Sequence, residues 1–116
     1  MGRKDDVISS AGYRIGPGEI EDCMLKHPAV MQAAAVGSPD ELRGEIVMAF
    51  IVLADGFKAS RGLEEEIQNT VRASLAAYEY PREIEFVNDL PMTTTGKVRR
   101  VELRERERQR KGLTNS

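Results

Sequence analysis

The segment VMQAAAVGSPDELRGEIVMAFIVL, residues 30–53, contains two apolar runs separated by a polar stretch. The runs Val30 to Val36 and Ile46 to Leu53 carry no charged residue and are bounded by residues that favour turns. Short apolar runs of this kind predict two buried strands. Between them, the sequence predicts a polar loop from Gly37 to Gly44 that carries Arg43.

Toward the N-terminus, we expect a short hairpin followed by a helix. The hairpin pairs residues 7–8 with residues 13–15 and has its turn at Gly12. Pro17 suits the first turn of the helix, which is predicted to end at His27-Pro28. The apolar face of this helix consists of Ile20, Cys23 and Met24.

Toward the C-terminus, the sequence predicts two helices and a third strand. Ser60 can cap the first helix, and the apolar residues of that helix recur every four positions: Leu63, Ile67, Val71 and Leu75. Residues 83–87 alternate between polar and apolar, as in a half-exposed strand. Residues 101–111 are dense in Glu and Arg at helical spacing, which favours a solvent-exposed helix. The expected fold is α+β, with a small sheet of about three strands flanked by helices and preceded by the hairpin.

The length of 116 residues predicts one domain, and the composition excludes several classes of function. Seventeen basic and nineteen acidic residues give a net charge of −2, which provides no general attraction to nucleic acid or to anionic membranes. The single cysteine, Cys23, excludes an internal disulfide, and with one histidine, His27, no metal site is expected. Both residues are interpreted as structural. No secretory signal or membrane-spanning apolar run is present, so we expect a cytoplasmic protein.

The segment PMTTTGKVRR, residues 91–100, places Lys97 behind Gly96 in a threonine-rich loop. A long, flexible ammonium suits a phosphate or carboxylate whose charge grows during a reaction. An isolated Gly-Lys pair is usually an ordinary surface feature, and no glycine stands at the spacing that a P-loop requires. A function for this loop can therefore be inferred only from the residues around the Gly-Lys pair.

That pattern resembles the C-terminal lysine motif of the adenylate-forming acyl-CoA synthetases. The matching positions are Pro91, Thr93, Gly96, Lys97 and Arg100. Residues 2–15, GRKDDVISSAGYRI, resemble the hinge motif of the same family, in the family's order and at about its spacing. Residues 1–116 thus resemble the small C-terminal domain of such an enzyme, and GYRIGP and YPR are most similar to medium-chain fatty acid and benzoate-type synthetases.

The resemblance implies a two-step reaction. A carboxylic acid and ATP form an acyl-adenylate and pyrophosphate, and coenzyme A then takes the acyl group and releases AMP. Lys97, in the loop 91–100, would serve the first step. Asp5, in the hinge segment 1–6, would be the pivot on which the domain rotates, while Arg3 and Arg14 would contact the nucleotide. ATP with magnesium would be held mainly by an N-terminal domain, the expected partner, which this sequence lacks, so the isolated domain should be nearly inactive.

The resemblance also implies a set of residues that face coenzyme A. Gly12 marks a position where a side chain would block the thiol, although a turn with positive φ explains a glycine equally well. Cations would contact the phosphates of coenzyme A, and flat rings would suit its adenine. The residues implied are Gly12, Tyr13, Arg43, Arg72 and Tyr80.

Two other functions remain open. An adenylation enzyme that loads a carrier protein carries the same two motifs; no carrier sequence follows Ser116, which favours free coenzyme A. A non-catalytic interaction module would bind a protein partner and would not depend on Lys97. The identity of the acid would be set by the N-terminal domain.

Overall fold

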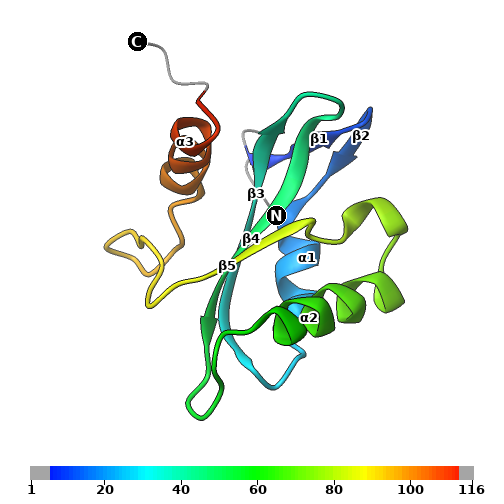
Figure 1. Ribbon diagram of the computed structural model, residues 1–116. Coiled ribbons are helices and arrows are strands. Elements are labelled where there is room, and N and C mark those ends of the chain that lie inside the picture. The colour runs from blue at the N-terminus through cyan, green and yellow to red at the C-terminus, as the bar shows by residue number, and fades with distance from the viewer. Residues whose placement is uncertain (1–5, 113–116) are drawn as a thin grey trace.

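The structure is a computed structural model that describes residues 6–112, in which five strands form one sheet with three α-helices packed on it. The elements are, in order, β1 (Ile8–Ser10), β2 (Tyr13–Ile15), α1 (Pro17–Met24), β3 (Val30–Asp40), β4 (Gly44–Leu53), α2 (Arg61–Ser74), the 3₁₀ turn η2 (Ala77–Glu79), β5 (Glu83–Phe86) and α3 (Arg100–Arg110). Figure 1 shows α1 and α2 on one side of the sheet and α3 on the other. The predicted α+β class is confirmed.

The sheet is organised around β4. Strand β3 runs antiparallel to β4 along its whole length, from Val30 opposite Leu53 to Asp40 opposite Gly44. On the other edge, β5 pairs in parallel with the middle of β4, and β1 joins it where Ser10 lies opposite Gly44. The β1–β2 hairpin, predicted as a separate unit, is therefore part of the sheet.

Helices cover both faces of the sheet, which explains why β3 and β4 read as continuous apolar runs. Alternate residues of β4 belong to two separate core clusters, because successive side chains of a strand point to opposite faces. The cluster under α1 and α2 takes Val47, Ala49 and Ile51, and the cluster under α3 takes Met48, Phe50 and Val52. None of the helices in residues 6–112 is long and apolar enough to cross a membrane.

Local sequence signals place the hairpin and the first two helices as predicted. Ala11 and Gly12 have φ angles of 51° and 88°, the two positive values of a tight hairpin turn. Pro17 begins α1, which ends at Met24, slightly before the predicted end. The Ser60 side chain accepts a hydrogen bond from the backbone N–H of Leu63 at 3.0 Å and caps α2.

Cys23 and His27 are both buried. Cys23 is buried in the cluster under α1 and α2. The backbone N–H of Ala29 donates to Nδ1 of His27 at 3.1 Å, and Nε2 lies 2.6 Å from Oε1 of Glu66. Nε2 therefore links the end of α1 to α2, and Nδ1 fixes the turn that follows α1.

The predicted polar loop from Gly37 to Gly44 is wrong in its extent. Strand β3 continues to Asp40, and only residues 41–43 lie between the strands. Ser38, opposite Ile46, is fully buried, and its hydroxyl donates to Oε1 of Glu107 at 2.8 Å. Pairing with β4 and a partner on α3 thus outweigh the local turn propensity of this segment.

The prediction of a solvent-exposed C-terminal helix is also wrong in part. The expected ion pair forms, with Arg106 3.7 Å from Glu102. However, α3 packs on β3, and Leu103 and Glu107 have exposed fractions of 0% and 1%. A single leucine and a buried carboxylate among many charges give too weak a periodic signal for a sequence-based prediction of burial.

Candidate functional site

The lysine loop, residues 91–100, folds as a small hairpin. Met92 and Val98 form an antiparallel bridge, and the backbone N–H of Thr93 donates to the carbonyl of Lys97 at 2.7 Å. Gly96 has a φ of 86° and donates its N–H to the carbonyl of Thr93 at 3.0 Å. The glycine closes the turn in a conformation that other residues rarely adopt.

Thr93 and Thr95 form hydrogen bonds within this loop, and no hydrogen bond in residues 6–112 uses the Lys97 side chain. The hydroxyl of Thr93 accepts a hydrogen bond from the backbone N–H of Lys97 at 3.1 Å and lies 3.0 Å from the hydroxyl of Thr95. The Lys97 side chain is exposed and makes no ion pair with any residue in 6–112. Among the described residues, the loop thus presents an ammonium without an acidic partner, on a backbone held by internal hydrogen bonds.

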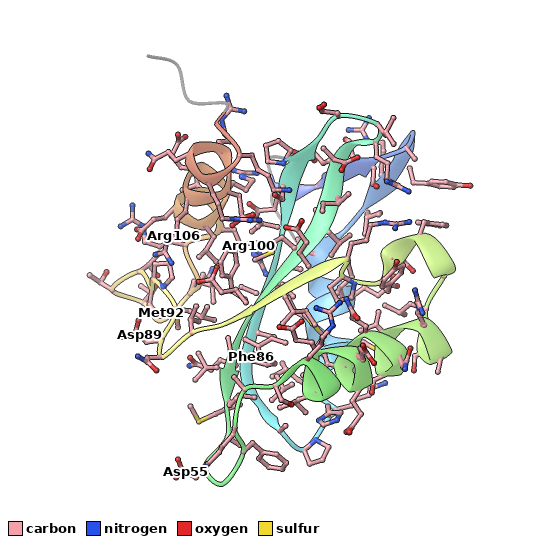
Figure 2. All side chains as sticks on the ribbon, viewed as in Figure 1. Asp55, Phe86, Asp89, Met92, Arg100 and Arg106 are labelled. Atoms are coloured by element: carbon pink, nitrogen blue, oxygen red, sulfur yellow. The ribbon has the colours of Figure 1, made fainter. Side chains whose placement is uncertain are left out.

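Arg100 connects the base of the loop to the body of the domain. Nε donates to Oε2 of Glu21 at 2.9 Å, Nη2 pairs with Oε1 of the same carboxylate, and Nη1 lies 3.4 Å from Oδ2 of Asp6. Hydrogen bonding to Glu21 raises the pKa of Arg100, although burial opposes this shift. Figure 2 shows Arg100 on the side of α3 that faces the sheet, whereas Arg106 lies on the outer side. Sequence reasoning recognised Arg100 only as part of a motif, because its partners lie far away in the chain.

A second group of candidate residues surrounds the β1–β2 hairpin. The backbone N–H of Ala11 donates to the carbonyl of Arg43 at 2.9 Å, so Gly12 lies beside the loop between β3 and β4. Arg43 is 3.7 Å from Asp40. The ring of Tyr13 stacks on the ring of Tyr78, with centroids 3.9 Å apart and planes 8° from parallel. This stack joins the hairpin to η2.

Arg72 on α2 contacts Tyr80, the residue that follows η2. The Arg72 guanidinium lies 4.1 Å from the centroid of the Tyr80 ring, and that of Arg82 lies 5.1 Å from it. Tyr78 and Arg82 were not among the predicted site residues, although the aromatic spacing of YEYPR was a usable signal. The structure therefore brings Gly12 and Arg43 together, connects Tyr13 to η2 through Tyr78, and brings Arg72 and Tyr80 together.

Glu79 adds an acidic group to this second region. Its carboxylate accepts the backbone N–H of Ala76 at 3.0 Å. Burial and a hydrogen bond with Glu19 raise the pKa of Glu79.

Of the other predicted site residues, the structure describes only Arg14. Arg14 is exposed and pairs with Ser9, and because it alternates with Tyr13 it points to the opposite face of the hairpin. Arg3 and Asp5 lie outside the described residues. Figure 1 shows the lysine loop (yellow to orange) beside α3 and well away from the β1–β2 hairpin (blue), so Lys97 and Gly12 do not share a site within this domain.

Comparisons with known proteins agree with one another. The family described as AMP-binding enzyme C-terminal domain matches residues 19–97. The human mitochondrial acyl-coenzyme A synthetase ACSM2B is 51% identical over 109 residues, which cover 92% of this chain and 19% of that protein. The chain thus spans about a fifth of the length of its curated relatives.

Two solved structures are similar over nearly the whole chain. An acyl-CoA synthetase from Brucella canis has a TM-score of 0.90 and 51% identity, covering 96% of this chain and 20% of its own. The anthranilate CoA ligase AuaEII, solved in complex with anthranoyl-AMP, has a TM-score of 0.90 and 38% identity, covering 97% and 22%. The chain therefore belongs to the AMP-binding enzyme C-terminal domain family, as a C-terminal domain of the acyl-CoA synthetase type.

Proposed function

We propose that this chain is the mobile C-terminal domain of an acid–CoA ligase, and that it supplies the lysine for adenylation and part of the coenzyme A site. The observation that carries the proposal is the lysine loop: an exposed Lys97, without an ion pair in residues 6–112, on a hairpin closed by Gly96. An ammonium held this way can approach a ligand bound by another domain.

Lys97 would act when the carboxylate oxygen attacks the α-phosphorus of ATP and pyrophosphate leaves. Two anions must approach, and negative charge grows on the phosphoryl oxygens. An ammonium that reaches both groups lessens the repulsion and stabilises the transition state. A preorganised contact of this kind contributes about 3–4 kcal/mol, or ~10²- to 10³-fold in rate.

ATP, magnesium and the acid would be bound mainly by an N-terminal domain. Within residues 6–112, no group of three or more His, Cys, Asp or Glu side chains is placed to hold a metal ion. The contribution of this domain would be the positive charge of its lysine and arginine side chains. Arg3 and Arg14 would add contacts to the nucleotide.

The region around the β1–β2 hairpin would serve the second step. Arg43 and Arg72 would contact phosphates of coenzyme A, the exposed rings of Tyr13 and Tyr78 offer flat surfaces, and Gly12 would leave room for the thiol arm. This region lies well away from the lysine loop (Figure 1), which supports the proposal that the domain presents the two in different orientations. Rotation about Asp5 would exchange them.

The test uses a full-length ligase that carries this domain, for example a chimera with the N-terminal domain of the Brucella canis acyl-CoA synthetase. Lys97→Ala should lower acid-dependent ATP–pyrophosphate exchange by ~10²- to 10³-fold. Formation of acyl-CoA from supplied acyl-adenylate should be kept. Lys58→Ala, which removes another exposed lysine, is the matched control and should change neither step.

Three outcomes contradict parts of the proposal. Unchanged exchange in Lys97→Ala rules out the adenylation role and favours an interaction module. Loss of both steps together rules out separate roles for the lysine loop and for the region around the β1–β2 hairpin. Transfer of the acyl group to a carrier protein but not to coenzyme A identifies the alternative, a carrier-loading enzyme.

A further inference from the structure

Three parts of the chain meet at Arg100. It is the first residue of α3 and follows Lys97 closely in the sequence. Its guanidinium pairs with both oxygens of the Glu21 carboxylate on α1 and lies 3.4 Å from Asp6, the first described residue. One turn further along α3, Arg104 lies 3.8 Å from the other oxygen of Asp6.

Both acidic partners of Arg100 are buried. The exposed fractions of Asp6 and Glu21 are 6% and 8%. Oε2 of Glu21 also accepts the backbone N–H of Ala35 at 2.8 Å, which fixes the carboxylate to β3. Two parallel N–H···O bonds between an arginine and a carboxylate fix the relative orientation of the groups as well as their distance. Arg100 is therefore held to the sheet in one orientation.

The lysine loop has few other features that could fix its orientation. Its backbone hydrogen bonds are internal, as in the 2.8 Å bond from the N–H of Arg99 to the carbonyl of Pro91. Leu90 and Val98 pack into the cluster under α3. Apolar contacts are less directional than an ion pair, so they hold the angle of the loop less firmly than its depth.

We propose that Arg100 is a positioning residue for adenylation: it locks the base of the lysine loop to the segment that begins at Asp6, directly after the pivot Asp5, so that Lys97 moves with the pivot as one body. Asp6 follows Asp5 in the sequence, and the ion pairs of Asp6 and Glu21 carry any rotation of that segment into α3. This inference rests on the proposed roles of Lys97 and Asp5. A displacement of about 1 Å at a reacting group can cost ~10²-fold in rate, which gives such a lock a catalytic value.

The chain contains a matched control. Arg110, at the other end of α3, also pairs with a buried carboxylate, that of Glu107, and with Glu83. A change at Arg110 therefore removes similar interactions from the same helix without touching the lysine loop or Asp6. A purely structural role for Arg100 predicts that both arginines behave alike.

The experiment measures both half-reactions in the full-length ligase for Arg100→Met and Arg110→Met. We expect Arg100→Met to lower pyrophosphate exchange by ~10- to 100-fold, mainly through kcat, with little effect on acyl-CoA formation from supplied acyl-adenylate. Arg110→Met should leave the ratio of the two steps unchanged. Arg100→Lys should restore part of the loss, because a lysine keeps the charge but cannot form the paired contact with Glu21.

Two further readouts separate positioning from stability. In a Lys97→Ala background, Arg100→Met should cause no additional loss of exchange, because the group that it positions is already gone. Hydrogen–deuterium exchange of residues 93–97 should be faster in Arg100→Met and unchanged in Arg110→Met. This second readout does not depend on activity.

The outcomes distinguish this inference from the proposed function. If Lys97→Ala retains pyrophosphate exchange, the proposed role of Lys97 is wrong, and the positioning role of Arg100 is then wrong as well. If Lys97→Ala abolishes exchange but the two arginine variants behave alike, only the positioning role is overturned. Unchanged deuterium uptake of residues 93–97 in Arg100→Met also overturns it.

Discussion

Gly12 and Gly96 stand in the turns of the two segments to which we assign function, and both have positive φ angles, 88° and 86°. A Cβ atom added at either position would meet no other atom within 4 Å. The backbone conformation alone therefore explains these glycines within the domain, at a cost of about 1–2 kcal/mol for a residue with a side chain. A close approach by the arm of coenzyme A would be an additional reason at Gly12.

Gly12→Ala separates these two reasons. The strained backbone should lower the free energy of unfolding by about 1–2 kcal/mol, measured by urea denaturation. If Gly12 borders the thiol arm, acyl-CoA formation should fall further than this loss of stability explains, while pyrophosphate exchange is kept.

Gly56→Ala is the control for this variant. Gly56 has a φ of 91° and equally open surroundings, but it lies in the loop between β4 and α2. It should show the same loss of stability and no change in either half-reaction. Equal acyl-CoA formation in the two variants would rule out the role of Gly12 in the coenzyme A site.

At the scale of an element, α3 shows how a highly charged helix can be part of a core. Leu103 is fully buried in the cluster that also contains Leu90 and Phe50, and Val98 packs against this cluster. Val101, two positions earlier, is 56% exposed. One face of the helix thus holds it to the sheet and supports the lysine loop, while the other faces are solvated.

Leu103→Ala should lower the free energy of unfolding by about 2–5 kcal/mol, because it removes buried contacts and leaves a cavity. Val101→Ala, on the exposed side of the same helix, should change it by no more than about 0.5 kcal/mol. Urea denaturation of both variants measures the difference. Similar values for the two would mean that α3 does not contribute to the core as described.

At the scale of the whole molecule, an ion-pair network ties the C-terminal end of α3 to both edges of the sheet. Glu107 accepts hydrogen bonds from Ser38 on β3 and from Arg110, and Arg110 reaches Glu83 on β5 at 2.6 Å. Lys111 lies 3.2 Å from the carbonyl of Pro39 and 3.3 Å from Glu83. Helix α3 is therefore joined to the sheet by charge as well as by apolar contacts.

Glu107 makes the stability of the whole domain depend on pH. Burial alone raises its pKa, but hydrogen bonds from Arg110 and Ser38 outweigh this effect and leave the pKa below its ordinary value of 4.5. A carboxyl group with a lowered folded-state pKa stabilises the fold above its unfolded-state pKa and loses that contribution as the pH falls. Unfolding free energy should therefore decline below about pH 4.5.

Glu107→Gln should be less stable than the wild type at neutral pH and should show a shallower decline in acid. Glu105→Gln, an exposed change on the same helix, serves as the control and should keep the wild-type decline. Urea denaturation between pH 3 and 7, within the range where carboxyl groups titrate, provides the measurement. A decline in Glu107→Gln as steep as in the wild type would show that other groups cause it.

Features with local signals could be predicted from the sequence. Gly12 specified a hairpin turn, Pro17 and Ser60 specified the starts of two helices, and the apolar runs specified two buried strands. The motif around Lys97 indicated the family. Each of these signals depends on residues close together in the chain, because backbone conformation and capping are local properties.

Features that depend on distant partners were decided only by the tertiary structure. Ser38 is buried because it meets Glu107, 69 positions away, and this contact extends β3 and draws α3 onto the sheet. Arg100 meets Glu21 across 79 positions, and no periodicity in the sequence indicates that pair. The sequence alone determined the turns, the caps and the family. Packing determined which charges are buried and what holds the lysine loop, because a buried ion pair requires two elements that only the folded chain brings together.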